Sequence, residues 1–239
     1  MGFEMRALRI VAACVFVVCF PLLLLSSSLL IMVGEIHLYE YGFDKYDITE
    51  VTGLERSELI KGAEGLIGYF NGERDSPQVQ VAKDGREIDL FKQREIDHLR
   101  DVKGLIDLFR LVLWVTLGYV VMYIVGGFAV RRKAFLPSIS RAVLSGSVFT
   151  LALFAFVGIW ALVDFQSLFL KFHLTSFQND LWILDPSKHY LIMMFPEEFF
   201  GDAAMFLVGG TVLEAVVMGG IAATYLVRRR KGNPTPLFL

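Results

Sequence analysis

Cysteine, histidine and charged residues are all scarce in this 239-residue sequence. It contains two cysteines, four histidines and 20% charged residues, against 55% in the hydrophobic set, and its mean hydropathy is +0.55. Both cysteines, Cys14 and Cys19, lie inside the first apolar run, so the chain cannot build a disulfide framework or a cysteine-based zinc cluster. A chain this apolar is also unlike an ordinary soluble domain. The composition therefore indicates an integral membrane protein.

An excess of positive charge is missing as well. The 23 basic and 25 acidic residues give a net charge of -2, which excludes the strongly basic surface of a nucleic-acid-binding protein. The sequence has no H-E-x-x-H motif in either direction and no G-x-S-x-G motif. We therefore expect no metal site, no cofactor and no serine nucleophile.

Four apolar runs are long enough to cross a bilayer core, which needs roughly 20 helical residues. The first is longer than the apolar core of a secretory signal and contains Pro21, so we interpret it as a retained span. The runs are 8–33, 105–130, 143–163 and 203–227. The predicted fold class is an all-α integral membrane protein with four transmembrane helices and a small extracytoplasmic cap containing a β-hairpin.

The orientation follows from basic residues beside the span ends, which favour the cytoplasm. These residues are Arg6, Arg9, Arg131, Arg132, Lys133, Arg141 and 228–231. Both termini are therefore expected in the cytoplasm of a multi-pass plasma membrane protein. The predicted segments are 1–33, N-terminus and first helix; 34–104, extracytoplasmic cap; 105–130, second helix; 131–142, cytoplasmic loop; 143–163, third helix; 164–202, extracytoplasmic interfacial loop; 203–227, fourth helix; and 228–239, cytoplasmic tail.

The two outer segments carry local structure of their own. In the first, 54–69 has the apolar spacing of an amphipathic helix ending at Asn71-Gly72, and 79–90 alternates around Asp84-Gly85, which predicts a hairpin. A charged helix, 94–104, should continue into the second span. The second segment is aromatic, which suits the membrane interface, and it has turn residues at 179–186. Pro196 is predicted as the first residue of the last helix.

Histidine is the natural general base near neutral pH, and the sequence has four, His37, His98, His173 and His189. All four fall on the predicted outer side. Asp101 lies three residues after His98, on the same helix face, where a carboxylate could orient the ring. His173 lies among phenylalanines, where desolvation favours the neutral, basic form. The structural alternatives are a surface ion pair and an interfacial anchor.

Charged residues within the predicted spans are informative because they are costly there. Glu214 is expected to face the bundle interior, either protonated or bonded to hydroxyls of neighbouring spans. Asp107 and Arg110 are spaced to pair with each other. A stripe of small residues, Ala215, Gly219 and Ala223, predicts close packing of the last span on a neighbour.

Two segments resemble one known family. They are Arg94–Lys103 (REIDHLRDVK) before the second span, and Phe172–Trp182 (FHLTSFQNDLW) followed by Phe195–Phe200 (FPEEFF). Both, in this order and topology, resemble the bacterial lipoprotein intramolecular transacylases (Lit), and the resemblance extends over nearly the whole chain.

The resemblance implies an acyl shift at the outer leaflet. The sn-2 acyl chain of a lipoprotein's S-diacylglyceryl cysteine would move to the α-amino group of the same cysteine, giving a lyso-form lipoprotein. Diacylated lipoproteins and membrane lipid would be the partners. The oligomeric state is left open, and a monomer is compatible with the sequence. The family's two functional histidines would correspond to His98 and His173, and residues expected to shape or support the site are Asp101, Lys103, Asn179, Asp180 and Trp182.

Under this interpretation His173 is the base toward the amine and His98 the donor to the oxyanion or leaving oxygen, and the sequence leaves the reverse assignment open. No covalent acyl-enzyme is required. Two other hypotheses remain: a non-catalytic membrane subunit whose cap binds a partner, and a membrane lipid ester hydrolase that uses the same pocket with water.

Overall fold

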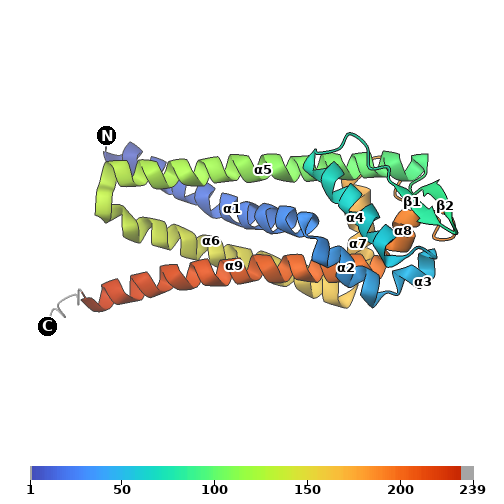
Figure 1. Ribbon diagram of the computed structural model, residues 1–239. Helices are drawn as coiled ribbons and strands as arrows, with labels where there is room; N and C mark the ends of the chain where they lie inside the picture. The colour runs from blue at the N-terminus through green and yellow to red at the C-terminus, as the bar shows by residue number, and fades with distance from the viewer. Residues whose placement is uncertain (1, 233–239) are drawn as a thin grey trace. The chain divides into compact units, whose positions relative to one another are not determined.

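The computed structural model describes residues 2–232, and its regular structure is almost entirely helical (Figure 1). The helices are α1 (Gly2–Gly34), α2 (Ile36–Lys45), α3 (Ile48–Thr52), α4 (Arg56–Asn71), α5 (Gln93–Arg131), the 3-10 helix η1 (Arg132–Phe135), α6 (Leu136–Val163), α7 (Phe165–Ser176), α8 (Tyr190–Met194) and α9 (Glu197–Gly232). The strands are β1 (Gln80–Lys83) and β2 (Arg86–Asp89).

Helices long and apolar enough to cross a membrane dominate this part of the chain. By length and composition there are three such stretches, Arg6–Gly34, Gln93–Val163 and Glu197–Lys231. The middle stretch has 71 residues and contains two helices, α5 and α6, between which the chain reverses at η1 (Figure 1). The four predicted runs thus fall within α1, α5, α6 and α9. Of the predicted tail 228–239, α9 includes residues up to Gly232, and 233–239 lie outside the described residues.

The chain divides into two compact units. The first comprises the described residues of Met1–Ser28, Leu111–Gly158 and Val208–Leu239. The second comprises Leu29–Arg110 and Ile159–Leu207. Both histidines singled out from the sequence belong to the second unit.

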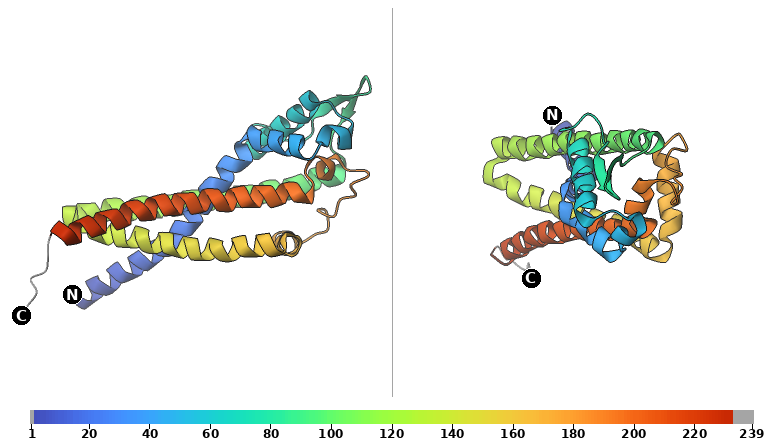
Figure 2. Two further views of the ribbon diagram at one scale, coloured as in Figure 1. Left: turned by 90° about the horizontal axis from the view of Figure 1, so that it is seen from below. Right: turned by 45° about the vertical axis from the view of Figure 1, so that its right-hand side comes forward.

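In the first unit α1 crosses the other long helices at an angle (Figure 2). The ring of Phe16 lies 5.0 Å from the ring of Tyr123 in α5. Further along α1, Phe20 packs on the backbone of α6 at Gly146, where a β-carbon would lie 2.9 Å from the Phe20 side chain. These contacts bury apolar side chains between helices, and they depend on a glycine that admits a large ring.

The predicted stripe of small residues does pack closely. Ala215 in α9 is fully buried, and a β-carbon on Gly219 would lie 2.8 Å from the β-carbon of Ser147 in α6. Nearby, the Glu214 carboxyl interacts with Ser28 of α1, as expected for an acid bonded to a span hydroxyl. Its Oε2 atom is buried without a hydrogen-bond partner among the described residues.

The core of the second unit forms where α4 meets the hairpin and α8. Leu59 and Leu66 of α4, Val81 of β1, Leu90 and Met194 are each no more than 1% exposed. Helix α4 matches the predicted amphipathic helix. It ends at Gly72, whose φ of +79° is a left-handed conformation that glycine adopts without strain.

The predicted hairpin is confirmed, with Val81 paired to Ile88 in an antiparallel register. Asp84 and Gly85 form its two-residue turn with φ of 53° and 75°, the positive values that a type I′ turn requires. Lys83 connects the hairpin to α3 and α8. Its Nζ donates to the carbonyl of Thr52 at 2.7 Å and to the hydroxyl of Tyr190 at 2.9 Å.

Two features differ from the sequence prediction. Helices α2 and α3 lie within 36–52, where the sequence analysis predicts no element. Helix α2 is short and charged, but Tyr39 and Phe43 have helical spacing and are buried. Pro196 was predicted as the first helical residue, but α9 begins at Glu197. The Pro196 carbonyl instead accepts the Phe199 amide at 3.0 Å, so the proline precedes the helix by one position.

The close packing of α9 on α6 can be tested at two adjacent glycines, Gly219 and Gly220. Gly219→Ala should destabilise the protein by about 1–3 kcal/mol, because the new methyl would overlap Ser147. Gly220→Ala should be neutral or stabilising by up to about 1 kcal/mol, because nothing lies within 4 Å of a β-carbon there and alanine is the better helix former. Thermal unfolding in detergent measures both. Equal melting temperatures for the two variants would contradict this packing.

Candidate functional site

His98 is positioned by the first turns of α5, before the apolar run of that helix begins. The helix starts at Gln93, and the Glu95 carboxylate accepts the Lys92 amide at 2.8 Å, which satisfies a donor that the helix itself cannot pair. His98 follows three residues later and is 8% exposed. Its Nδ1 atom is buried and has no hydrogen-bond partner among the described residues.

His173 is positioned by α7, a helix capped by the Asp164 carboxylate, which accepts the Ser167 amide at 3.0 Å. His173 is also 8% exposed. Its Nδ1 lies 2.8 Å from the carbonyl oxygen of Phe169, one helical turn back. Because a carbonyl only accepts, we assign the proton of the neutral ring to Nδ1. Nε2 then carries the lone pair, which makes it the basic atom.

The two histidines lie together although 75 residues separate them in the sequence. Their ring centroids are 6.4 Å apart, with 29° between the planes. Phe177 contacts both rings, at 5.2 Å from His98 and 5.6 Å from His173. Phe169, Phe172 and Trp182 complete the surroundings of His173 at 4.3, 5.4 and 4.9 Å. The predicted aromatic environment of His173 is therefore confirmed, and we refer to these two residues as the histidine pair.

Burial keeps both rings of the pair uncharged at neutral pH. Desolvation lowers the pKa of His98 to about 4, with a further lowering by His173 and an opposing effect of the Asp101 charge. Desolvation also lowers the pKa of His173, partly opposed by its bond to the Phe169 carbonyl. A neutral imidazole can accept a proton at one nitrogen and donate from the other.

Asp101 contributes in a way that differs from the sequence expectation. Its Oδ2 accepts a hydrogen bond from Asn179 Nδ2 at 2.8 Å, and His98 Nδ1 has no partner within residues 2–232. Asp101 therefore does not orient the His98 ring by a hydrogen bond at Nδ1, and its described effect on this ring is through its charge. The reason is tertiary, since Asn179 approaches α5 from a distant part of the chain.

Asn179 and Trp182 form a turn against the histidine pair. Asn179 Oδ1 accepts the Leu181 amide at 3.0 Å, and the backbone carbonyl of Asn179 accepts Trp182 Nε1 at 3.0 Å. This second bond holds the indole against His173. The expected turn-forming role of Asn179 is therefore present, and the same residue connects the turn to α5.

Asp180 and Lys103 lie in contacts that hold segments together. Arg94 of α5 donates to the Asp180 carbonyl, and its guanidinium lies 3.6 Å from the Asp180 carboxylate. Lys103 donates to the Tyr69 carbonyl at the end of α4, and its Nζ lies 4.7 Å from the Tyr69 ring. The described contacts of Lys103 are thus with α4 and not with the histidine pair.

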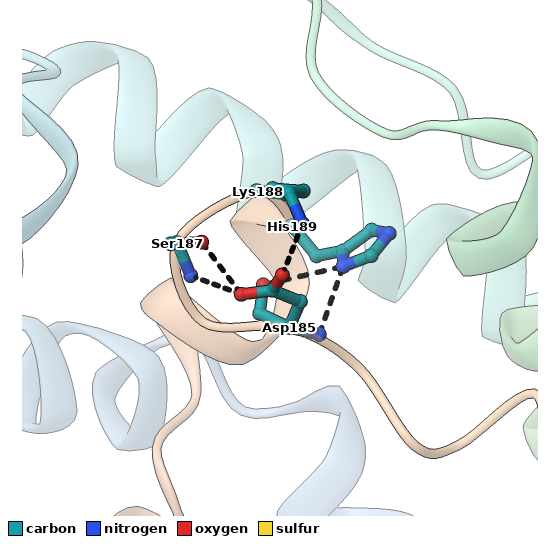
Figure 3. Close-up of polar contacts among 4 residues, drawn as sticks. All are labelled: Asp185, Ser187, Lys188 and His189. Carbon is teal, nitrogen blue, oxygen red and sulfur yellow. Dashed lines mark hydrogen bonds and ion pairs between the residues drawn. The ribbon is translucent and has the colours of Figure 1, made fainter.

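The other two histidines make separate local contacts. His37 is exposed and pairs with Glu35. His189 precedes α8, and its Nδ1 lies 3.0 Å from the Asp185 amide, which donates to it (Figure 3). The Asp185 carboxylate accepts from the Ser187 amide at 2.9 Å and pairs with Lys188 at 2.6 Å, which confirms the predicted turn. Figure 3 therefore shows His189 as part of a turn.

Glu95 is a site-supporting residue that the sequence analysis missed. It is fully buried, and its Oε1 accepts the amide of Leu191 in α8 at 2.7 Å. One carboxylate thus caps α5 and ties α8 to it. The sequence signal was weak, because a capping box normally pairs such a glutamate with serine or threonine, and here the partner is Lys92.

Most of the chain matches a known family. Residues 14–200 match the model of the family described as lipoprotein intramolecular transacylase Lit. An uncharacterized protein from Aquifex aeolicus (strain VF5) is 25% identical over 203 residues, which cover 84% of this chain and 88% of that protein.

The fold is similar to that of a protein from Bacillus cereus solved in meso, the membrane integral lipoprotein intramolecular transacylase Lit. Its TM-score is 0.79 at 21% identity, over 95% of this chain and 100% of that one. Variants of that protein with a histidine replaced by arginine or by alanine give TM-scores of 0.75 and 0.73, at 19% and 20% identity. The match to the arginine variant covers 97% of each chain. The match to the alanine variant covers 97% of this chain and 99% of the other.

Because the solved structures are at most 21% identical to this chain, they establish only its fold. The assignment to a family depends on the family match. That match spans most of the chain and includes both members of the histidine pair. The protein therefore belongs to the lipoprotein intramolecular transacylase (Lit) family and is a membrane acyltransferase.

Proposed function

We propose that this protein moves the sn-2 acyl chain of a lipoprotein's S-diacylglyceryl cysteine to the α-amino group of that cysteine. The product is an N-acyl, S-monoacylglyceryl lipoprotein. Diacylated lipoproteins are the substrate class, and the histidine pair is the catalytic site. The arrangement of His173, with Nδ1 bonded to Phe169 and Nε2 left as a base beside a second neutral imidazole, carries the proposal.

The reaction requires one proton to move from nitrogen to oxygen. The amine attacks the ester carbonyl, and His173 Nε2 accepts the proton that the amine loses. An N–H of His98 donates to the oxyanion, or to the glyceryl oxygen as the C–O bond breaks and the C–N bond remains. His173 then delivers the proton that it accepted to the departing glyceryl oxygen, while His98 keeps its own proton as a hydrogen-bond donor, so both rings end neutral and the total mass is unchanged.

Neutral rings suit this chemistry better than charged ones. A protonated His173 could not accept the amine proton, and a protonated His98 beside it would be repelled by any charge that His173 acquires. The lowered pKa of each ring keeps both in the required form at neutral pH. Because amine and ester belong to one molecule, positioning supplies much of the rate, with effective molarities that can reach about 10⁵ M.

The proposed location is the outer leaflet of the plasma membrane. We infer that α1, α5, α6 and α9 each cross the membrane once, that both termini are cytoplasmic, and that 34–104 and 164–202 form the outer segments. The basic residues beside the helix ends support this orientation. A substrate held by its acyl chains would then present its ester at the depth of the aromatic residues around His173.

Four further residues are proposed as positioning residues. Asn179 and Trp182 hold the turn against His173, Asp101 receives Asn179, and Asp180 is held by Arg94. Lys103 is proposed to support the site indirectly, through its contact with Tyr69.

A direct test is tandem mass spectrometry of a synthetic diacylglyceryl-cysteine lipopeptide incubated with the purified protein. Fragment ions should place one acyl group on the amino terminus while the intact mass stays constant. His98→Gln and His173→Gln should each slow this relocation by about 10²- to 10⁴-fold, the usual contribution of a positioned acid or base. His37→Gln, at the exposed pair with Glu35, is the matched control and should react like wild type.

Two outcomes would overturn the proposed function. Loss of one acyl mass with release of fatty acid would show a lipid ester hydrolase that uses water as the acceptor. Full activity in both variants of the histidine pair would remove it from the mechanism.

The neutral state of the pair can be tested by NMR titration of ring-labelled histidines in detergent. Acidification should protonate His37 before either ring of the histidine pair, because its bond to Glu35 raises its pKa above the usual 6.5. His173 should follow below 6.5, and His98 should protonate last, near pH 4. Assignment uses the single glutamine variants. Protonation of His98 before His37 would show that the site is hydrated and not dry.

The charge effect of Asp101 gives a separate prediction. Asp101→Asn keeps an oxygen to receive Asn179 but removes the negative charge that raises the pKa of His98. The pKa of His98 should therefore fall further, with a loss of activity smaller than in His98→Gln. Asp97→Asn, which alters a carboxylate bonded to Gln93 and Arg100, is the control and should leave the His98 titration in place. An unchanged His98 pKa in Asp101→Asn would contradict this role.

A further inference from the structure

A large open groove lies in the first unit, between the beginning of α1, the end of α5 and the beginning of α6. Its volume is about 940 Å³. Apolar side chains dominate its lining, among them Val17, Met122, Val130, Phe135 and Phe149. The groove shares no residue with the histidine pair, so the acyl transfer proposed above does not account for it.

Four arginines line this apolar groove. They are Arg6 and Arg9 of α1, Arg131 of α5 and Arg141 of α6. None of them forms an ion pair with a described residue, and no acidic side chain is found among the described residues of the lining. Arg131 Nη1 donates to Ser138 Oγ at 2.9 Å, which fixes the direction of its guanidinium. The groove therefore combines positive charge that has no acidic partner in its lining with an apolar wall, and we refer to it as the basic groove.

Aromatic rings and two glycines form part of the apolar wall. Phe135 lies 5.5 Å from Tyr123 and occupies the space above Gly127, so a side chain at Gly127 would displace it. The neighbouring Gly126 also lines the groove, and a β-carbon there would meet nothing within 4 Å. The space beside Gly126 is thus free for a flexible chain.

We propose that this groove binds an anionic glycerophospholipid, with its phosphate at the arginines and an acyl chain along the apolar wall. Charge complementarity selects the anion, because guanidinium groups are well suited to phosphate oxygens. An inorganic anion would leave the apolar wall without a partner. A zwitterionic lipid would bring its own positively charged group close to the arginines, which would repel it. Basic pockets between transmembrane helices on the cytoplasmic side are a known form of lipid site, and these arginines lie at the ends assigned to that side.

Native mass spectrometry in detergent tests the proposal with phosphatidylglycerol, phosphatidylcholine and inorganic phosphate as separate additions. Wild type should retain phosphatidylglycerol more tightly than the other two. Arg9→Gln/Arg141→Gln should weaken phosphatidylglycerol binding by about 10- to 30-fold, from roughly one charge interaction lost per arginine. The matched control, Arg230→Gln/Lys231→Gln, removes the same charge from the end of α9, outside the groove, and should bind as wild type does.

A second variant tests the apolar half with every charge in place. Gly126→Leu places a side chain in the groove and should weaken phosphatidylglycerol binding, while cooperative thermal unfolding shows that the variant is folded. Equal binding of phosphatidylglycerol and phosphatidylcholine, equal losses in the two charge variants, or wild-type binding by Gly126→Leu would each overturn the proposal. Inorganic phosphate that binds as tightly as the lipid would also overturn it, because the acyl chain would then contribute nothing.

Discussion

The hydrogen bond from His173 Nδ1 to the Phe169 carbonyl decides what the site can do. This bond places the single N–H proton of the neutral ring on Nδ1, so Nε2 is the basic atom. The aromatic residues around His173 exclude water and make that neutral form the stable one, and the same burial keeps His98 uncharged beside it. Two uncharged rings can share one site without repulsion, which two imidazolium ions 6.4 Å apart in an apolar environment could not do.

The first turns of α5 hold the segment that completes this site. Arg94 pairs with Asp180, Asp101 receives Asn179, and Glu95 accepts the amide of Leu191. Glu95 is buried, so its two hydrogen bonds are needed to offset the desolvation of a carboxylate. The Arg94–Asp180 and Asp101–Asn179 contacts are more exposed, so they orient the 179–180 segment more than they stabilise the fold. Together they place Phe177 and Trp182 against the rings, and an irregular segment thus becomes a defined wall of the site.

The distribution of charge separates two regions of the chain. In the histidine pair, burial keeps both rings uncharged, and the proposed proton transfer depends on those neutral rings. In the basic groove, four arginines share an apolar wall without acidic partners among the described residues. The proposed acyl transfer uses two neutral rings near an ester, whereas the proposed recognition of a phosphate uses fixed positive charge. The two sites therefore need opposite electrostatic environments, which different residues supply.

The sequence alone determined the helical membrane class, the α4 helix, the Asp84-Gly85 hairpin and the aromatic environment of His173, because each depends on residues close together in the chain. It also made His98 and His173 candidates from their neighbouring residues, and the resemblance to a family pointed to the two of them together. The tertiary structure decided that the two rings lie together, that Asp101 binds Asn179 and not His98, and that Glu95 joins α5 to α8. These contacts depend on residues that are 75 or more positions apart, and no local pattern reports such distances. The basic groove was likewise undetectable from sequence, because its arginines first meet when three helices pack.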